Sequence, residues 1–466
     1  MKLKDTLSQT FKYIDSKQPV IQIYSCGPTV YDYPHLGNWY AFLRWDLLIR
    51  ALKLQDYTVN WVMNITDVGH LASDADEGED KLVQKARQER KTAQEIAQYY
   101  TEYFLHSLQK LNFIMPNHLP KATEYIDQQI DLIKKLESQG VTYMINDGLY
   151  YDTSKLPDYG KLAQLNRQGF KSTDRIDFNE QKRHLTDFAL WKLSPKKQKR
   201  DMEWDSPWGR GFPGWHAECS AMSEAHFNLP IDIHTGGIDH IPIHHTNELA
   251  QSEVAYQKPL AKIWLHSNFI TVEGQKMAKS KANFYTLEDL LKANYDLESF
   301  RLAVFSSRYS KAVDFNWQLL DQAQKRFQRW QNMIVLRFQT TLQAEEKIHL
   351  EDFKQLKEIC LENINDNLNS PAILEVIDKF SHQLTIPLSE NLKPALEDLG
   401  YFMDNLLGLS LMQIPDISIE QKEKLDQRHK ARQDNDFENS DRLRRELLEQ
   451  GISILDTEFG QIWQLN

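Results

Sequence analysis

The chain has 466 residues, of which 55 are Lys or Arg and 66 are Asp or Glu, giving a formal net charge of −11. Hydrophobic residues make up 41% and charged residues 26%, which excludes bulk disorder, and the negative charge disfavours a protein that coats nucleic acid indiscriminately. Three cysteines exclude a disulfide scaffold and favour a reducing compartment. We find neither an apolar run of about 18 residues nor an apolar signal segment. We therefore expect a cytoplasmic protein of roughly three domains with no membrane contact.

A parallel α/β sheet is predicted near the start of the chain. Residues 20–25 are apolar and predict a short buried strand, and a loop rich in Gly and Pro follows at 26–37. Helical spacing covers 38–55, and residues 57–65 alternate as in a second strand. This order is typical of a parallel sheet, in which ligands bind outside the carboxyl ends of the strands.

The middle of the chain combines helices with an insertion. Residues 80–111 predict one polar helix, whose dense charges favour a solvated face over a binding patch. A second helix is predicted at 123–138 and a β-hairpin at 141–151. Residues 150–212 are loop-rich, and a second α/β portion runs over 214–270.

The remainder is predominantly helical. A lysine-rich loop at 273–283 precedes a helical pattern over 286–409. Pro415 then opens a short module, 416–466, for which we expect two helices and a strand. Trp463 and the basic residues of the module suit contacts with an unpaired RNA base and with RNA phosphates. These basic residues are Arg428, Lys430, Arg432, Arg442, Arg444 and Arg445. A solvated helix pair explains the charges equally well.

Two short motifs could hold a nucleotide. His35, Gly37 and Asn38 lie where a strand passes into a helix, and a helix N-terminus suits phosphates. Lys276 and Lys279 lie three apart on the lysine-rich loop and can embrace a polyphosphate. An ordinary turn and a solvated basic loop are the alternatives. The presence of both motifs in one chain favours a shared ligand.

A glycine pair offers a third nucleotide contact. Gly236 and Gly237 follow an apolar strand, and Asp239 comes two positions later, where its carboxylate can accept from ribose hydroxyls. A plain strand-to-helix turn is the alternative. Residues 209–214 match G-x-G-x-x-G literally, but no apolar strand precedes them, so we reject a dinucleotide fingerprint.

A metal site is possible around two of the cysteines. His244 and Glu248 lie one helical turn apart, and with Cys26 and Cys219 they would form a tetrahedral set that suits zinc. An ordinary i,i+4 pair and two core cysteines remain the alternative. Cys360 lies on a helix face with apolar neighbours, so we expect it to pack in a core.

Two short motifs and three longer segments are similar to those of a known family. His35-Leu-Gly-Asn38 and Lys276-Met-Ala-Lys-Ser280 resemble the two signature motifs of class I aminoacyl-tRNA synthetases. Segments 26–32, 214–222 and 244–252 are similar to those of the cysteinyl-tRNA synthetase family in its compact bacterial form. The resemblance extends from about residue 20 to the C-terminus.

The resemblance implies a Rossmann-like catalytic domain with an insertion, a helical bundle and an anticodon-binding module. The expected boundaries are 1–115 and 214–270 for the two halves of the catalytic domain, 116–213 for the insertion, 271–300 for the lysine-loop and stem-contact region, 301–414 for the bundle and 415–466 for the module.

The resemblance also implies the site residues. One zinc ion per chain would be held by Cys26, Cys219, His244 and Glu248. Mg-ATP would contact His35, Gly37, Asn38, Gly236, Gly237, Asp239, Lys276, Lys279 and Ser280, of which His35, Asn38, Lys276 and Lys279 take the catalytic role. The cysteine pocket would include Thr29, Trp215, His216 and Asp239.

The implied reaction is ATP-dependent attachment of cysteine to its tRNA by a monomer, through a cysteinyl-adenylate, with zinc selecting the thiol. The sequence departs from the family at Ala278, where Ser is usual, at residues 281–282, and after residue 67, where an acidic stretch is replaced. Two alternatives remain: a cysteine ligase with a non-tRNA acceptor, and a non-catalytic RNA-binding paralogue.

Overall fold

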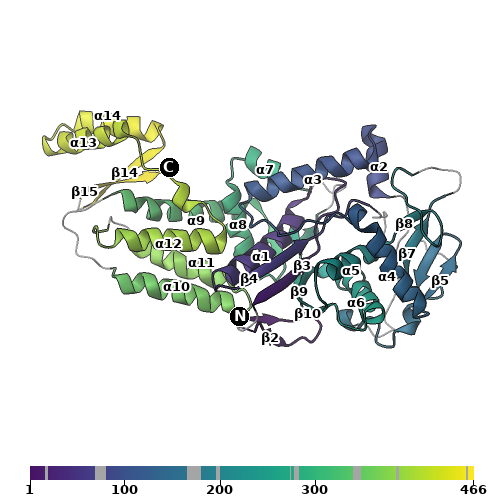
Figure 1. The fold of residues 1–466 in the computed structure, drawn as a ribbon. Coiled ribbons are helices and arrows are strands. Elements are labelled where there is room, and N and C mark those ends of the chain that lie inside the picture. Colours follow the sequence, from purple (N-terminus) through teal and green to yellow (C-terminus); the bar gives the residue numbers. More distant parts are fainter. Residues whose placement is uncertain are drawn as a thin grey trace. The chain divides into compact units, whose positions relative to one another are not determined.

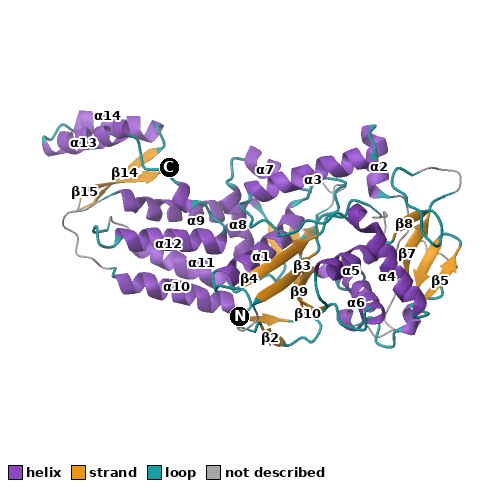
Figure 2. Cartoon of the chain, viewed as in Figure 1, coloured by secondary structure: helices purple, strands orange, loops and turns teal. Residues whose placement is uncertain are grey.

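In the computed structural model, the chain divides into two compact units: residues 1–286 with 309–314, and residues 287–308 with 315–466. Figures 1 and 2 show their elements. The structure describes residues 1–15, 19–68, 80–164, 180–195, 200–272, 274–277, 283–339, 348–384, 388–457 and 460–466.

The first unit is built on a four-stranded parallel sheet. In spatial order its strands are β10 (Ala261–Ser267), β9 (Ile231–Gly237), β3 (Val20–Ser25) and β4 (Thr58–Met63). All three pairings are parallel. The predicted Rossmann-like sheet is therefore confirmed, including both strands expected before residue 66.

The direction of the chain reverses between β3 and β9. Helix α1 (Leu36–Lys53) connects β3 to β4, and α6 (His244–Ala255) connects β9 to β10 in the opposite lateral direction. Because such crossovers are right-handed, the two helices lie on opposite faces of the sheet, as Figure 1 shows. The carboxyl ends of β3 and β9 thus meet at a switch point, where α/β sheets bind ligands.

The predicted helix over 80–111 is wrong in one respect, because it forms two helices. They are α2 (Lys81–Glu89) and α3 (Ala93–Lys110). Arg90 adopts the left-handed conformation, with φ of 57°, and ends α2. Thr92 and Glu95 then form a capping box that begins α3. Local capping therefore overrides the continuous helical spacing.

The insertion contains more regular structure than expected. Helix α4 (Ile126–Ser138) and the predicted hairpin are present. The described part of 150–212 is largely loop, as expected, but two strands that were not expected extend the hairpin to a four-stranded antiparallel sheet (Figure 2). In order these strands are β5 (Thr142–Ile145), β6 (Gly148–Tyr151), β7 (Phe188–Leu193) and β8 (Gly211–Pro213). Strand β8 lies within the rejected segment 209–214, and α5 (Trp215–His226) follows.

Two small sheets accompany the first unit. The first pairs β1 (Lys2–Lys4) with β2 (Phe11–Tyr13). The second has the order β12 (Gln275–Lys276), β11 (Ile270–Val272) and β13 (Val313–Phe315).

The second unit is helical, as predicted, except at its C-terminal end. Its helices are α7 (Leu287–Lys292), α8 (Leu297–Phe305), α9 (Trp317–Ile334), α10 (Leu350–Asn365), α11 (Ser370–Gln383), α12 (Lys393–Leu407), α13 (Ile419–Gln433) and α14 (Phe437–Glu449). The expected strand, β14 (Ile452–Thr457), pairs with an unexpected one, β15 (Gly460–Leu465). Cys360 is fully buried on α10, as predicted. Among the described residues, none of the helices is long and apolar enough to cross a membrane.

Two residues proposed for RNA contact in the C-terminal module are unsuited to it. Trp463 is only 5% exposed, because it packs in a core with Val335 and Leu447, so it cannot stack on an unpaired base. Arg428 is fully buried, and its guanidinium donates to both carboxylate oxygens of Asp456 at 2.8 and 2.7 Å. Both residues hold the module together.

Candidate functional site

The candidate site lies at the switch point of the parallel sheet. Two adjoining cavities open there and share Cys26, Gly27, His35, Asn38, Asp239 and His240 in their walls. The first cavity also contacts Gly37, Gly236 and Gly237. The second contacts Thr29, Trp215, Cys219 and His244. The two groups of predicted residues, for nucleotide and for amino acid, are thus neighbours.

His35 and Asn38 cap helix α1. The Asn38 backbone N–H donates to His35 Nδ1 at 3.2 Å, and the His35 backbone N–H donates to Asn38 Oδ1 at 3.0 Å. Because Nδ1 accepts a hydrogen bond, the neutral imidazole carries its proton on Nε2, which can donate to a ligand. The expected helix began at Asn38, whereas α1 begins at Leu36. Its N-terminal N–H groups therefore lie beside the cavity.

The glycine pair forms the end of β9. A side chain at Gly236 would place its Cβ 2.5 Å from the His245 ring and 2.7 Å from that of His240. Only glycine lets these two rings approach the strand so closely. Asp239 follows in a turn of 3₁₀-helix and lines both cavities.

The four predicted metal ligands lie together. Sγ of Cys26, at the end of β3, is 4.0 Å from Sγ of Cys219 on α5. His244 Nε2 is 2.7 Å from Glu248 Oε1, one turn apart on α6. One donor atom from each residue falls within 4.8 Å of the others, and all four side chains are buried. Two sulfurs about 2.3 Å from a tetrahedral zinc lie about 3.8 Å apart, so the thiol pair fits that ion.

The charges at this group suit a cation. Burial and the neighbouring Cys219 raise the pKa of Cys26. Burial also opposes ionisation of Cys219, but its interactions with Cys26 and His244 prevail and lower its pKa to about 6. Burial would lower the pKa of His244, yet the Glu248 carboxylate raises it to about 10. The pKa of Glu248 is lowered, because His244 and His234 outweigh its burial. A thiolate and a carboxylate thus share the protonated His244 ring, and a metal ion bound at this point would displace that proton.

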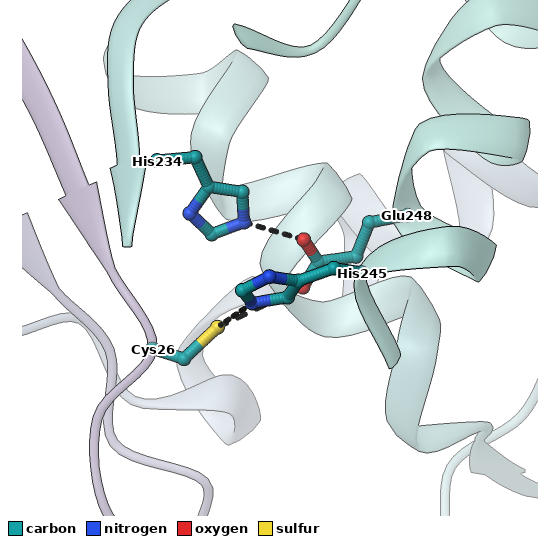
Figure 3. Close-up of side chains that lie close together, drawn as sticks. All are labelled: Cys26, His234, His245 and Glu248. Atoms are coloured by element: carbon teal, nitrogen blue, oxygen red, sulfur yellow. Dashed lines mark hydrogen bonds and ion pairs between the residues drawn. The ribbon is translucent and has the colours of Figure 1, made fainter. Parts of the chain in front are cut away.

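A second donor set overlaps the first and was missed by sequence reasoning. It combines Cys26 and Glu248 with His234 and His245 (Figure 3). His234 Nε2 lies 2.5 Å from Glu248 Oε2, and His245 Nε2 lies 3.2 Å from Cys26 Sγ. The other ring nitrogens contact Tyr24 O and His266 Nε2, at 3.0 and 2.8 Å, which orients both imidazoles. The signal in the sequence was the density of histidines between residues 234 and 266.

The expected cysteine-pocket residues take different positions. Thr29 and Trp215 line the second cavity, and the Trp215 ring stacks on that of His244 with centroids 4.3 Å apart. His216 is fully buried, and its Nδ1 lies 3.1 Å from Nδ1 of His244. His216 therefore contacts the predicted metal ligand His244 from within the protein interior.

The lysine loop is described only in part. Lys276 belongs to the short strand β12, and Met277 lines the first cavity. Lys279 and Ser280 lie outside the described residues, as does Ala278.

Comparisons with known proteins identify the family. Residues 11–325 match the family model described as the catalytic domain of class I tRNA synthetases (C). A cysteine–tRNA ligase of Treponema denticola is 36% identical over 100% of this chain and 99% of its own length. Cysteine–tRNA ligase 1 of Burkholderia lata is 38% identical over 98% and 96%.

A solved structure agrees in fold. Methionyl-tRNA synthetase of Mycobacterium tuberculosis, in complex with methionyl-adenylate, superposes with a TM-score of 0.59 over 85% of this chain and 93% of its own, at 12% identity. That similarity concerns the fold alone. The full-length relatives and the matching catalytic-domain model show that the chain belongs to the cysteine–tRNA ligase family of class I tRNA synthetases.

Proposed function

We propose that the chain attaches L-cysteine to cysteine-accepting tRNA in an ATP-dependent reaction. One observation carries the proposal. A buried group of two thiols, an imidazole and a carboxylate lies beside a cavity, and the N-terminus of a helix, which suits phosphates, forms another part of the cavity wall. The first feature suits recognition of a thiol and the second suits a nucleotide. The family membership supports the same activity.

The reaction has two steps. The cysteine carboxylate attacks the α-phosphorus of ATP, forming cysteinyl-adenylate and releasing pyrophosphate. A terminal ribose hydroxyl of the tRNA then attacks the activated carbonyl and releases AMP. Covalent attachment to the protein is not needed, so the residues act by positioning the substrates and stabilising phosphate charge.

The nucleotide contacts follow from the cavity. The imidazole Nε2–H of His35 and the Gly37 backbone N–H in the first turn of α1 would donate to the phosphates, and Asp239 would accept from the ribose. We propose that Lys276 and Lys279 contact the pyrophosphate portion, with Ser280 beside them. Mg²⁺ accompanies the ATP.

The thiol contacts follow from the donor set. Of the two overlapping sets, we propose that zinc occupies Cys26, Cys219, His244 and Glu248. Two cysteine sulfurs as ligands favour zinc over harder cations. Cys26, Cys219 and His244 line the second cavity, so the site is open to a substrate sulfur. Zinc, when bound, supplies a sulfur-preferring Lewis acid that distinguishes cysteine from serine. Thr29 and Trp215 would flank the substrate.

The remaining assignments are also proposals. Residues 1–115 and 214–270 would form the two halves of the catalytic domain around the 116–213 insertion. Residues 271–300 would contact the acceptor stem, and residues 415–466 the anticodon, linked by the bundle 301–414. We propose a cytoplasmic monomer.

Isotope exchange tests the proposal. We expect the chain to catalyse exchange between ATP and labelled pyrophosphate only when cysteine is present, and then to charge cysteine-accepting tRNA. Exchange without charging would indicate a different acceptor, and absence of exchange would refute the activity.

A further inference from the structure

A group of tyrosines lies beside the catalytic loop, outside the site described above. The Tyr33 ring, just before His35, is surrounded by three rings of α3. Its centroid lies 6.4 Å from that of Tyr99, 5.1 Å from Tyr100 and 4.7 Å from Tyr103, each at an edge-to-face angle. The hydroxyl oxygens of Tyr33 and Tyr99 are 2.9 Å apart. These contacts hold the rings in fixed positions.

Two rings of this group, those of Tyr33 and Tyr99, face solvent. Tyr33 is 36% exposed and Tyr99 is 45% exposed, whereas Tyr100 is 2% exposed and supports them. A fixed, half-exposed ring offers a flat face at little cost in conformational entropy.

Basic side chains surround the rings. Lys91 Nζ lies 5.3 Å from the centroid of Tyr99, and Lys85 Nζ lies 5.8 Å from that of Tyr100. Lys85 also pairs with Asp32 and Glu89, at 3.9 and 3.3 Å. Residues 81–91 nevertheless carry five basic side chains and one acid, a local charge of +4 in a chain of net charge −11. We call Tyr33, Tyr99, Tyr103, Lys85 and Lys91 the tyrosine–lysine surface.

This surface is continuous with the candidate site. The second cavity, which contains Cys219 and His244, is also lined by Tyr33, Asp32 and Lys81. Tyr33 therefore belongs both to the wall of the cavity and to the aromatic group outside it. A substrate reaching the cavity from this side crosses the exposed rings first.

We propose that the tyrosine–lysine surface binds the unpaired 3′ nucleotides of the tRNA acceptor. This inference rests on the proposed function, in which the terminal ribose must reach the cavity. Exposed aromatic faces flanked by lysines are the means by which proteins hold single-stranded nucleic acid: bases stack on the rings and phosphates meet the cations. The sequence alone favoured a solvated helix face here, because it did not show the α3 tyrosines gathering around Tyr33.

Direct binding of two RNAs tests the proposal with the full-length chain. The probes are transcribed cysteine-accepting tRNA and the same tRNA lacking its unpaired 3′ nucleotides. We expect Tyr99→Ala to weaken binding of the complete tRNA about 5- to 150-fold, the range for loss of one stacked base, and to leave binding of the shortened tRNA unchanged. Tyr99→Phe keeps the ring and should bind nearly as the unaltered chain does.

A second variant tests the charge. Lys91→Gln should reduce the slope of log affinity against log salt by about 0.7, the value for one single-strand phosphate, again only with the complete tRNA. The matched control for Tyr99→Ala is Tyr401→Ala, which removes a 58% exposed ring from α12.

Two results would overturn the proposal: equal weakening of both RNAs by Tyr99→Ala, or no weakening of either. Absence of cysteine-dependent exchange in the unaltered chain would refute the proposed function instead, and direct tRNA binding would still test this surface.

Discussion

Cys26 and Cys219 are separated by 193 positions in the sequence, yet their sulfur atoms lie 4.0 Å apart. The carboxyl end of β3 and the helix α5 bring them together, and α6 adds His244 and Glu248 from one face. Each residue taken alone is a common buried side chain. Their chemistry depends on convergence, because a thiolate and a carboxylate directed at one point are favourable only around a cation.

Replacing one thiol tests the ligand set. We expect Cys219→Ala to lose stoichiometric zinc, because one of two soft ligands is removed. The preference for cysteine over serine in pyrophosphate exchange should fall by about 100-fold or more, because the metal–sulfur contact supplies the discrimination. Zinc content by atomic absorption and kcat/KM for both amino acids measure these effects.

The matched control is Cys360→Ala. This thiol is equally buried, but it lies on α10 in the other unit. The control should retain zinc and the preference. Full zinc occupancy in Cys219→Ala would contradict the proposed ligands.

At the scale of a single element, helix α1 begins with residues that have both a structural role and a proposed functional role. His35 and Asn38 satisfy each other's backbone N–H groups, so the residues proposed to contact phosphate also begin the helix. A loss of activity on replacing His35 could therefore come from either role.

Two substitutions separate these roles. His35→Ala removes the cap and the Nε2 donor, so we expect a loss of about 1 kcal/mol in the free energy of unfolding together with reduced exchange activity. His35→Asn keeps a good cap, and should restore most of the stability but not the activity. Urea unfolding and pyrophosphate exchange measure the two properties. Recovery of full activity in His35→Asn would show that His35 acts only as a cap.

At the scale of the whole molecule, a net charge of −11 is compatible with RNA binding because charge is distributed unevenly. In the C-terminal module, burial of Arg428 and Trp463 leaves other basic side chains for RNA contact. Arg445 is exposed on α14 and lines a shallow cavity with Arg444, Glu438 and Asp441. The module's arginines thus divide between the structural role of Arg428 and the RNA contact proposed for Arg445.

The exposed arginine gives a prediction for tRNA binding. Arg445→Gln should raise the KM for tRNA several-fold and reduce the slope of log affinity against log salt by about 0.7, the value for one single-strand phosphate. Lys379→Gln on α11, whose side chain is 70% exposed, is the control. Equal effects of the two substitutions would indicate only a general loss of positive charge.

Local sequence patterns predicted correctly those elements whose formation depends on neighbouring residues. The parallel strands, the hairpin and most of the helices follow from hydrophobic period and turn residues. Local patterns failed at 80–111, where capping at Thr92 interrupts a continuous helical pattern, and over 150–212, where the short strands β7 and β8 depend on pairing with a neighbour.

The sequence by itself determined the family, the reaction expected of it and four candidate donor residues, because motifs record chemistry in residue types and spacing. Only the tertiary structure decided which donors converge, that His234 and His245 form a second set around Cys26 and Glu248, and that Trp463 and Arg428 are buried. It also gathered the tyrosines of α3 around Tyr33. Burial and convergence arise from packing between distant segments, and the free energy of that packing is not a property of any local stretch of sequence.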